Sequence, residues 1–295
     1  MTDPRFIHLR FHSEYSITDG IVRVDPMIHA VEKSGGVAIG ICDLMNIFGG
    51  LRFYTHALAA GIKPILGCDL RVMNPKDLKK PYRLGVYCMN HEGYHSLCVL
   101  LTKAFLTKND AARGLIDPAW FDNGGGKGLI CLSGASQGEL GQLLLSKRWA
   151  LAEEALERYK AWFPDCFYVE LQRAGRPSDE LATARLANFA AEHRIPVVAT
   201  HPIQFLNKED FEAHEVRCSI AEGYTLQDPR RSRNFTEEQY FKSEDEMCEL
   251  FKDIPAALVN SVEIAKRCNL DGVLSKPQLP LFPTPDGMSL DDYID

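Results

Sequence analysis

The amino-acid sequence predicts an α/β fold, a distorted seven-stranded βα barrel with a helical extension after it. Short apolar runs typical of buried strands alternate with longer stretches of helical period along most of the chain. Several polar residues follow the expected strands directly, and barrels of this type carry their sites on the loops at the carboxyl ends of the strands. A doubly wound sheet is the alternative, but it would place a glycine-rich loop after its first strand, where residues 12–16 contain no glycine.

The expected strands are seven short runs, and apolar residues recur at every third or fourth position in the stretches between them. Strands are expected at residues 6–11, 37–42, 62–72, 82–88, 129–132, 166–171 and 195–200. Helices are expected at residues 26–34, 50–60, 93–105, 149–163 and 178–193. This alternation is typical of parallel strands joined by crossover helices.

The pattern changes twice along the chain, which predicts three parts. Residues 1–224 form the barrel, and residues 225–278 are expected to be helical at 236–240, 243–252 and 256–268, with Ser243 and Glu246 as a capping box. Residues 279–295 begin with a proline-rich linker. Ser289 then precedes an acidic first turn, as at the start of a helix. A helix that begins so near residue 295 suggests that the sequence is cut from a longer protein.

Composition narrows the cellular setting of the chain. It is 45% hydrophobic and 25% charged, with no run near the roughly 18 apolar residues of a membrane span and no apolar core of a signal peptide at its start. We therefore expect a cytoplasmic protein with no membrane partner. The nine cysteines are odd in number and form no Cys-x-x-Cys pair, so we expect reduced thiols.

The charge of the chain argues against tight binding of nucleic acid by this part alone. The formal net charge is −7, which gives no overall attraction for a phosphate backbone. The one dense basic cluster in the sequence contains Arg230, Arg231 and Arg233. A solvated basic loop is the simpler interpretation, because no aromatic residues interleave these arginines.

Polar residues near the ends of three expected strands form the candidate site. His8, Arg10 and His12 alternate along the first strand and therefore share one face. Asp43 and Asp69 lie at the ends of the next two strands, and imidazole and carboxylate groups are ligands for zinc or manganese. Taken singly, each residue is more simply a hydrogen-bonded histidine or a loop-anchoring aspartate. Three ligands are also too few for a phosphoesterase that uses two or three metal ions.

Longer motifs extend these observations over the whole chain. The first motif is His8-Leu9-x-Phe11-His12-Ser13-x-Tyr15-Ser16-x-x-Asp19-Gly20, and related stretches follow at residues 43–49, 61–67, 132–134, 167–173, 197–200, 244–247, 260–265 and 279–283. This pattern closely resembles the PHP (polymerase and histidinol phosphatase) domain that begins the alpha subunit of bacterial DNA polymerase III, in its proteobacterial form. The resemblance implies the barrel described above, within a parent chain that is a DNA-directed DNA polymerase. Residues 279–295 would then be a linker and the truncated start of the polymerase region.

The resemblance also implies that the metal site of the family is largely lost here. Family ligands are substituted at six positions, namely Arg10, Leu44, Arg83, Ala135, Pro202 and Gln204. Only His12, Asp19 and Asp69 remain as vestigial ligand positions. Because a fixed arginine charge repels a divalent ion, we expect no metal, no other cofactor and no catalytic residue in this domain.

The resemblance implies a structural role with a protein partner. The domain would dock the proofreading exonuclease, join the remainder of the alpha subunit and meet DNA only through the parent polymerase. One alternative is a residual phosphoesterase, pyrophosphatase or 3′–5′ exonuclease that uses zinc or manganese at His12, Asp19, Asp43 and Asp69. Another is an anion-binding module in which Arg10, Arg83 and His201 form a phosphate pocket.

Overall fold

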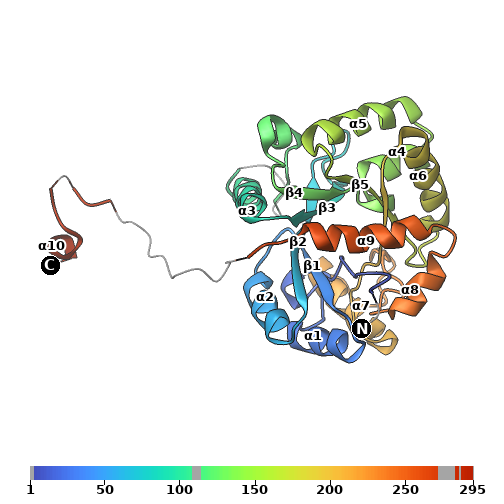
Figure 1. Cartoon of the computed structure of the whole chain (residues 1–295), viewed down its shortest axis with the longest axis horizontal. Helices are drawn as coiled ribbons and strands as arrows, with labels where there is room; N and C mark the ends of the chain where they lie inside the picture. Colours follow the sequence, from blue (N-terminus) through green and yellow to red (C-terminus); the bar gives the residue numbers. More distant parts are fainter. Residues whose placement is uncertain (1–2, 108–113, 272–282, 286, 295) are drawn as a thin grey trace.

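A single curved sheet of six strands lies at the centre of the molecule (Figure 1). The structure, a computed structural model, describes residues 3–107, 114–271, 283–285 and 287–294. The order of the strands across the sheet follows their order along the chain. They are β1 (Ala38–Leu44), β2 (Lys63–Val72), β3 (Tyr82–Cys88), β4 (Leu129–Leu132), β5 (Phe167–Gln172) and β6 (Val197–Thr200). The α/β class is confirmed, and each strand overlaps one that the sequence predicted.

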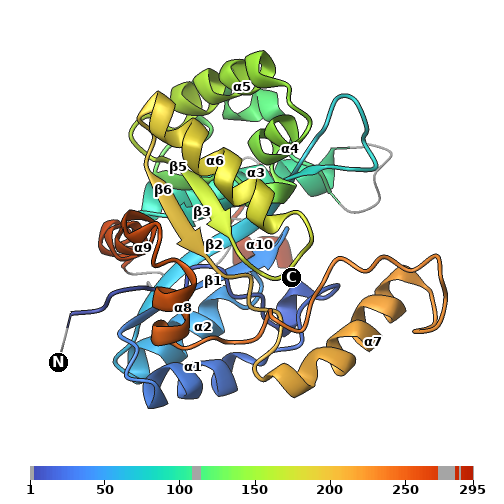
Figure 2. The same ribbon diagram turned by 90° about the vertical axis from the view of Figure 1, so that its right-hand side faces the viewer.

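Helices cover the outer face of the curved sheet (Figures 1 and 2). The helix α2 packs against β2, α3 against β3, α6 against β5 and α9 against β6. The helices are α1 (Val24–Lys33), α2 (Gly50–Ala59), α3 (His91–Leu106), α4 (Glu139–Leu145), α5 (Trp149–Trp162), α6 (Asp179–His193), α7 (Phe211–Glu222), α8 (Glu244–Leu250), α9 (Pro255–Arg267) and α10 (Leu290–Ile294). All five helices expected within the barrel are confirmed. The helices α4 and α7 were not predicted.

The expectation of a wholly parallel sheet is wrong at β3. This strand pairs antiparallel with both β2 and β4, whereas the other three pairings are parallel. The link from β2 to β3 spans residues 73–81, which is shorter than the dozen or so residues that a crossover helix needs. Because β3 runs backward, Arg83 near its start lies directly across from Arg71 near the end of β2. The reversal therefore brings Arg83 to the rim where the parallel strands end.

The expected first strand is not formed as a regular strand, so the described sheet has six strands and not seven. Residues 6–12 run extended, and Phe11 makes isolated bridges to Ile41 of β1 and to Ile203, which follows β6. The backbone amide of Ile203 donates to the carbonyl oxygen of Arg10 at 2.9 Å, and that of His12 donates to the carbonyl oxygen of Ile203 at 3.0 Å. The segment thus lies between the first and last strands and holds its side chains beside both.

The C-terminal helices share the core of the sheet. Val262 and Ile264 of α9 belong to the same buried apolar cluster as Leu9. The side-chain amide of Asn260 also donates to the carbonyl oxygen of Val197 in β6, at 2.7 Å. Burying apolar side chains of this size stabilises a fold by roughly 1.5–3 kcal/mol each. The helix expected at 236–240 is wrong, because that stretch forms turns and a bridge between Tyr240 and Phe205.

Two predicted helix starts are confirmed. Ser243 accepts a hydrogen bond from the amide of Glu246, whose carboxylate accepts in return from the amide of Ser243, and this capping box opens α8. Ser289 accepts from the amide of Asp292 at 3.1 Å and so caps α10. The proline-rich linker expected at 279–285 lies largely outside the described residues.

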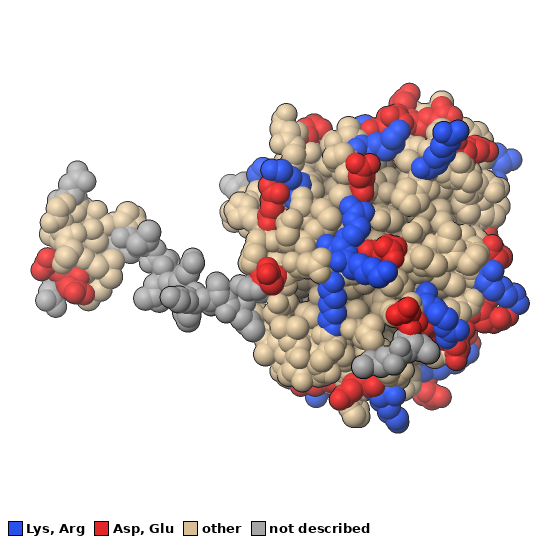
Figure 3. Space-filling model, in the orientation of Figure 1, with Lys and Arg blue, Asp and Glu red and all other residues tan. Residues whose placement is uncertain are grey.

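The surface carries charges of both signs. On the face drawn in Figure 3, lysine and arginine side chains lie among aspartate and glutamate side chains, and no broad basic area spans that face. Arg230 pairs with Asp228 at 2.7 Å, and Arg231 pairs with Glu215. Neighbouring acids therefore compensate two of the three clustered arginines. The described helices include none with the length and apolar character needed to cross a membrane.

Candidate functional site

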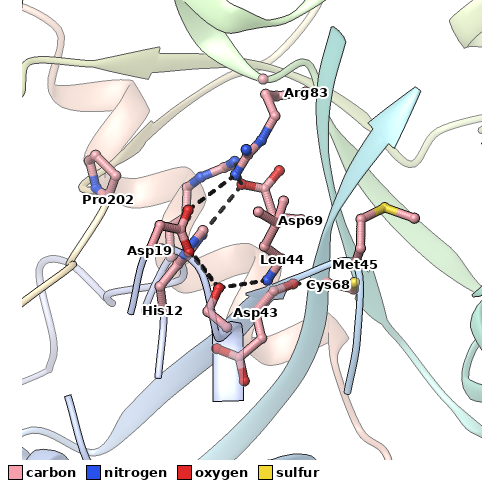
Figure 4. A network of polar contacts seen from close by, with 12 residues as sticks. His12, Asp19, Asp43, Leu44, Met45, Cys68, Asp69, Arg83 and Pro202 are labelled. Atoms are coloured by element: carbon pink, nitrogen blue, oxygen red, sulfur yellow. Dashed lines mark hydrogen bonds and ion pairs between the residues drawn. The ribbon is translucent and has the colours of Figure 1, made fainter. Parts of the chain in front are cut away.

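The predicted site residues gather at one end of the sheet (Figure 4). Arg10 and His12 come from the extended N-terminal segment, Asp69 from β2 and Arg83 from the start of β3. All four line one cavity of about 100 Å³, together with Asp19. Arg10, His12 and Asp69 are almost wholly buried, so their charges interact with little screening by water.

The carboxylate of Asp69 is the centre of the network. It pairs with the guanidinium group of Arg10 and lies 2.5 Å from that of Arg83, and Nε2 of His12 is 3.3 Å away. Burial alone would raise the pKa of Asp69, but the charges of Arg10 and Arg83 hold it well below its usual range. Asp69 is therefore ionised and engaged by the chain itself.

His12 lies between two carboxylates. Its Nδ1 atom is 3.2 Å from Asp19, and the hydroxyl of Ser16 donates to the same oxygen at 2.7 Å. Burial favours the neutral ring, but the charges of Asp19 and Asp69 outweigh it and raise the pKa of His12 to about 9. Burial likewise disfavours ionised Asp19, yet His12 and Arg83 lower its pKa to about 2. Both carboxylates therefore stabilise a proton on His12, and that proton would compete with a metal ion for the ring nitrogens.

Asp43 does not join this network. Its carboxylate accepts from the backbone amide of Ser13 at 2.6 Å and from the Ser13 hydroxyl at 2.7 Å, and it points away from Arg83 (Figure 4). Burial raises the pKa of Asp43 to about 6, although the hydrogen bonds from Ser13 oppose the shift. The carboxylate anchors the loop after residue 12, as the simpler interpretation of the sequence had it.

Only some of the six substituted positions line the cavity. Pro202 and Gln204 line it, whereas Leu44 and Ala135 do not. Ala135 begins a short 3-10 turn with a φ of 47°, a conformation that strains residues with a Cβ. The backbone amide of Leu44 donates to the Ser16 hydroxyl at 2.9 Å. Four of the six substituted positions are therefore grouped around one cavity.

The structure does not bring His201 together with the two arginines. Its Nε2 atom lies 2.9 Å from the carbonyl oxygen of Tyr240, and its ring lies 6.3 Å from that of His8. Burial lowers the pKa of His201 to about 3, and the positive charge of Lys242 adds to the shift. The ring is therefore neutral near pH 7 and lies outside the lining of the cavity.

Glu170 is a site residue that the sequence analysis missed. It lies on β5 with no exposed surface, and Nη1 of Arg10 donates to both of its carboxylate oxygens at 3.2 Å. The backbone amide of Gly134 at 3.0 Å and the hydroxyl of Thr200 at 2.5 Å also donate to it. A lone glutamate inside an apolar strand was the available signal, because a buried carboxylate requires a cationic or hydrogen-bonding partner.

The arrangement does not fit a divalent metal ion. Within the ranges that the structure describes, no group of three or more His, Cys, Asp or Glu side chains is placed to hold one. Arg10 and Arg83 both pair with Oδ2 of Asp69, while Oδ1 of the same carboxylate has no hydrogen-bond partner among the described residues, so a metal ion at Asp69 would lie beside two fixed cations. Each guanidinium would repel each unit of ionic charge by on the order of 4 kcal/mol at about 4 Å. No metal-dependent step is derived from this geometry.

Comparison with known proteins places the chain in a family. A family model described as the PHP domain matches residues 8–174. The chain is 49% identical over 296 residues to DNA polymerase III subunit alpha from Neisseria meningitidis serogroup A, and 43% identical over 294 residues to that from Escherichia coli K12. Both matches cover 100% of this chain, but they cover only 26% and 25% of the two relatives. The chain thus spans about a quarter of the length of these curated relatives.

The solved structures include more distant likenesses. A metal-free, sulfate-bound amidohydrolase from Chromobacterium violaceum is 12% identical, with a TM-score of 0.47 over 72% of this chain and 96% of that one.

The DNA polymerase III alpha subunits align with this chain through their N-terminal part alone. From the matched model and these relatives it follows that the chain belongs to the PHP domain family and is homologous to the N-terminal region of DNA polymerase III subunit alpha.

Proposed function

We propose that this domain is a metal-free structural and docking domain at the start of a cytoplasmic, replicative DNA polymerase. The observation that carries the proposal is the ion-pair network in which Arg10 and Arg83 both pair with Asp69, while Arg10 also pairs with Glu170. Nucleotidyl transfer and contact with DNA would belong to the remainder of the alpha subunit. The identity of 42–49% to curated alpha subunits over nearly the whole chain supports this assignment.

The metal content of the purified protein tests this proposal. Mass spectrometry of the metals, after incubation with zinc or manganese and desalting, should find less than one ion per chain. A chelator should leave the melting temperature (Tm) unchanged, because metal binding that is coupled to folding requires a larger ligand set. Stoichiometric metal, with a Tm that falls on chelation, would favour the alternative of a residual phosphoesterase, pyrophosphatase or exonuclease.

We further propose that the proofreading exonuclease docks on an apolar hollow of about 890 Å³. Large apolar side chains on its rim are exposed, namely Ile17 at 53%, Phe48 at 67% and Phe105 at 56%. Exposed apolar groups clustered around a hollow mark interaction surfaces. The family resemblance supplies the identity of the partner.

A matched pair of variants tests the docking surface. Phe48→Ser should weaken binding of the exonuclease from the same organism by at least about tenfold, because buried aromatic anchors carry much of the energy of an interface. Val259→Ser, at a 55% exposed position on α9, should bind as the parent does. Titration calorimetry measures both. Equal affinities would place the partner elsewhere, and no binding by the parent chain would remove the exonuclease as its partner.

We also propose that residues 6–12 complete a distorted seven-stranded barrel and that residues 1–224 and 225–278 fold as one unit. The isolated bridges at Phe11 support the first part, and the packing of α9 against β6 supports the second. Amide hydrogen exchange is the test. The amides of His12 and Ile203 should exchange as slowly as those of β1, and rapid exchange at either would leave the barrel open.

A further inference from the structure

Two lysines form one edge of the apolar hollow on which the partner is proposed to dock. Lys79 and Lys80 lie on the link between β2 and β3, line the hollow and are exposed. The exposed side chains of Ile17, Phe48 and Phe105 belong to the same lining. The hollow therefore joins an apolar surface to a pair of positive charges.

Hydrogen bonds within the link hold the backbone of both lysines in place. The side-chain amide of Asn74, which is buried, donates to the carbonyl oxygen of Lys80 at 3.2 Å. The carboxylate of Asp77 accepts from the backbone amide of Lys79 at 3.1 Å. Because this backbone is ordered before a partner arrives, less conformational entropy is lost when the partner binds.

The acids of the hollow do not compensate these two charges. Asp19 pairs with His12, and the carboxylate of Glu222 accepts from the backbone amide of Ser232 at 3.1 Å and from its hydroxyl. Within the described parts of the chain, no ion pair joins either lysine to a carboxylate. Although the formal net charge of the chain is −7, this edge of the hollow is locally positive.

We propose that the segment of the partner that occupies this hollow carries acidic side chains beside apolar ones. Its apolar groups would pack against Phe48 and Phe105, and its carboxylates would pair with Lys79 and Lys80. The inference rests on the proposed docking of the exonuclease and adds the chemistry of the docked segment. Complementary charges at the rim of an interface speed the encounter and fix the register of the partner. Two lysines on an acidic chain are too few to hold a nucleic-acid backbone tightly.

Association kinetics with the exonuclease from the same organism test the charge. The double variant Lys79→Gln with Lys80→Gln should associate about fivefold more slowly at low ionic strength, and added salt should slow it less than the parent. Lys33→Gln with Lys147→Gln removes the same charge from exposed positions outside the hollow and should behave as the parent does. Equal rates and salt dependence in the parent and the first variant overturn the acidic segment, even where Phe48→Ser weakens binding. No binding by the parent overturns this inference together with the proposed docking.

Carbodiimide cross-linking of the complex identifies the paired groups. The reagent activates a carboxylate, and a lysine amine in contact with that carboxylate displaces the reagent and forms an amide bond. Mass spectrometry of the digested complex should find Lys79 or Lys80 joined to an aspartate or glutamate of the exonuclease. Cross-links from other lysines of this chain, with none from these two, overturn the proposal. Protection of both lysines from acetylation by a DNA oligonucleotide, but not by the exonuclease, overturns it in favour of a nucleic-acid contact.

Discussion

Arg10 shows how one side chain can bridge two carboxylates inside a fold. Its guanidinium group lies between Asp69 of β2 and Glu170 of β5, and all three side chains are buried. Burying a carboxylate without a cation costs a large desolvation free energy. A cation held between the two strands offsets part of that cost by its attraction for both carboxylates. The arginine thus supplies positive charge at the position where the resemblance implies a lost metal ligand.

Replacing Arg10 should therefore destabilise the fold strongly. Arg10→Met keeps much of the side-chain volume but leaves Asp69 and Glu170 with fewer partners, and the free energy of unfolding should fall by on the order of 3 kcal/mol. Arg158→Met removes an exposed ion pair with Glu139 and should cost less than about 1 kcal/mol. Urea denaturation at neutral pH measures both. Equal losses would show that the buried pairs contribute no more than a surface pair does.

His12 should make stability depend on pH in a defined window. Its folded pKa of about 9 lies above the ordinary value of 6.5, so its contribution is complete below pH 6.5 and is lost as the pH rises through 9. The full difference corresponds to roughly 3 kcal/mol. Denaturation of the parent and of His12→Gln is measured from pH 6 to 10, and the free energies of unfolding are subtracted at each pH. The cysteine thiols titrate in both proteins, so their effect cancels in this difference. A flat curve would contradict a charged His12.

Individual residues also show how much of the candidate site could be predicted from the sequence. The structure places His12 beside Asp19 and Asp69; the sequence indicated His12 and Asp69 by their positions near strand ends and Asp19 through the family motif. The role of Glu170 depends on its contact with Arg10 from the far end of the sheet, and no local pattern encodes that contact. The position of His201 depends on the carbonyl of Tyr240, which lies in a stretch that was wrongly expected to be helical.

At the scale of elements, strand direction was the main feature that the sequence left undetermined. Burial alternation and β-branched runs predict where a strand lies, but they are the same for either direction. The short link at residues 73–81 was the available indication that β3 turns back on β2. Long helices with clear apolar periodicity or capping residues were predicted, whereas α4 and α7 were missed and the helix expected at 236–240 does not form.

The capping box of α8 provides a test at this scale. Ser243→Ala removes the acceptor for the Glu246 amide and should lower the free energy of unfolding by about 1 kcal/mol. The change should lower the free energy of global unfolding, because the buried side chain of Met247 anchors α8 to the rest of the fold. Ser289→Ala removes a similar cap from α10, none of whose described residues is buried, and should leave the global transition unchanged. Equal effects of the two changes would contradict this account.

Across the whole molecule, the site exists only because distant parts of the chain meet. The N-terminal segment supplies Arg10 and His12, the reversed strand β3 supplies Arg83, and the loop after β5 supplies Arg176. The curvature of the six-stranded sheet brings these groups to one cavity. Restoring metal ligands is therefore a test of the whole fold and not of one loop.

The last prediction is that metal binding can be rebuilt in this fold. The variant combines Arg10→His, Leu44→His, Arg83→His, Ala135→Cys, Pro202→Asp and Gln204→His. It frees Asp69 from two cations and adds three imidazoles and one carboxylate to the lining of the cavity, with a further imidazole and a thiol at positions 44 and 135 outside that lining. Zinc or manganese should therefore bind and raise its Tm.

A double change, Arg10→Met with Arg83→Met, is the matched control for this variant. It removes both cations without adding a ligand and should bind no metal, and neither should the unmodified chain. Titration calorimetry with each metal compares all three proteins. A sixfold variant that folds and binds nothing would show that the positions no longer converge as metal ligands must. Metal bound by the double variant would show instead that His12, Asp19 and Asp69 suffice once the arginines are gone, which would make electrostatic repulsion the sole barrier to metal binding.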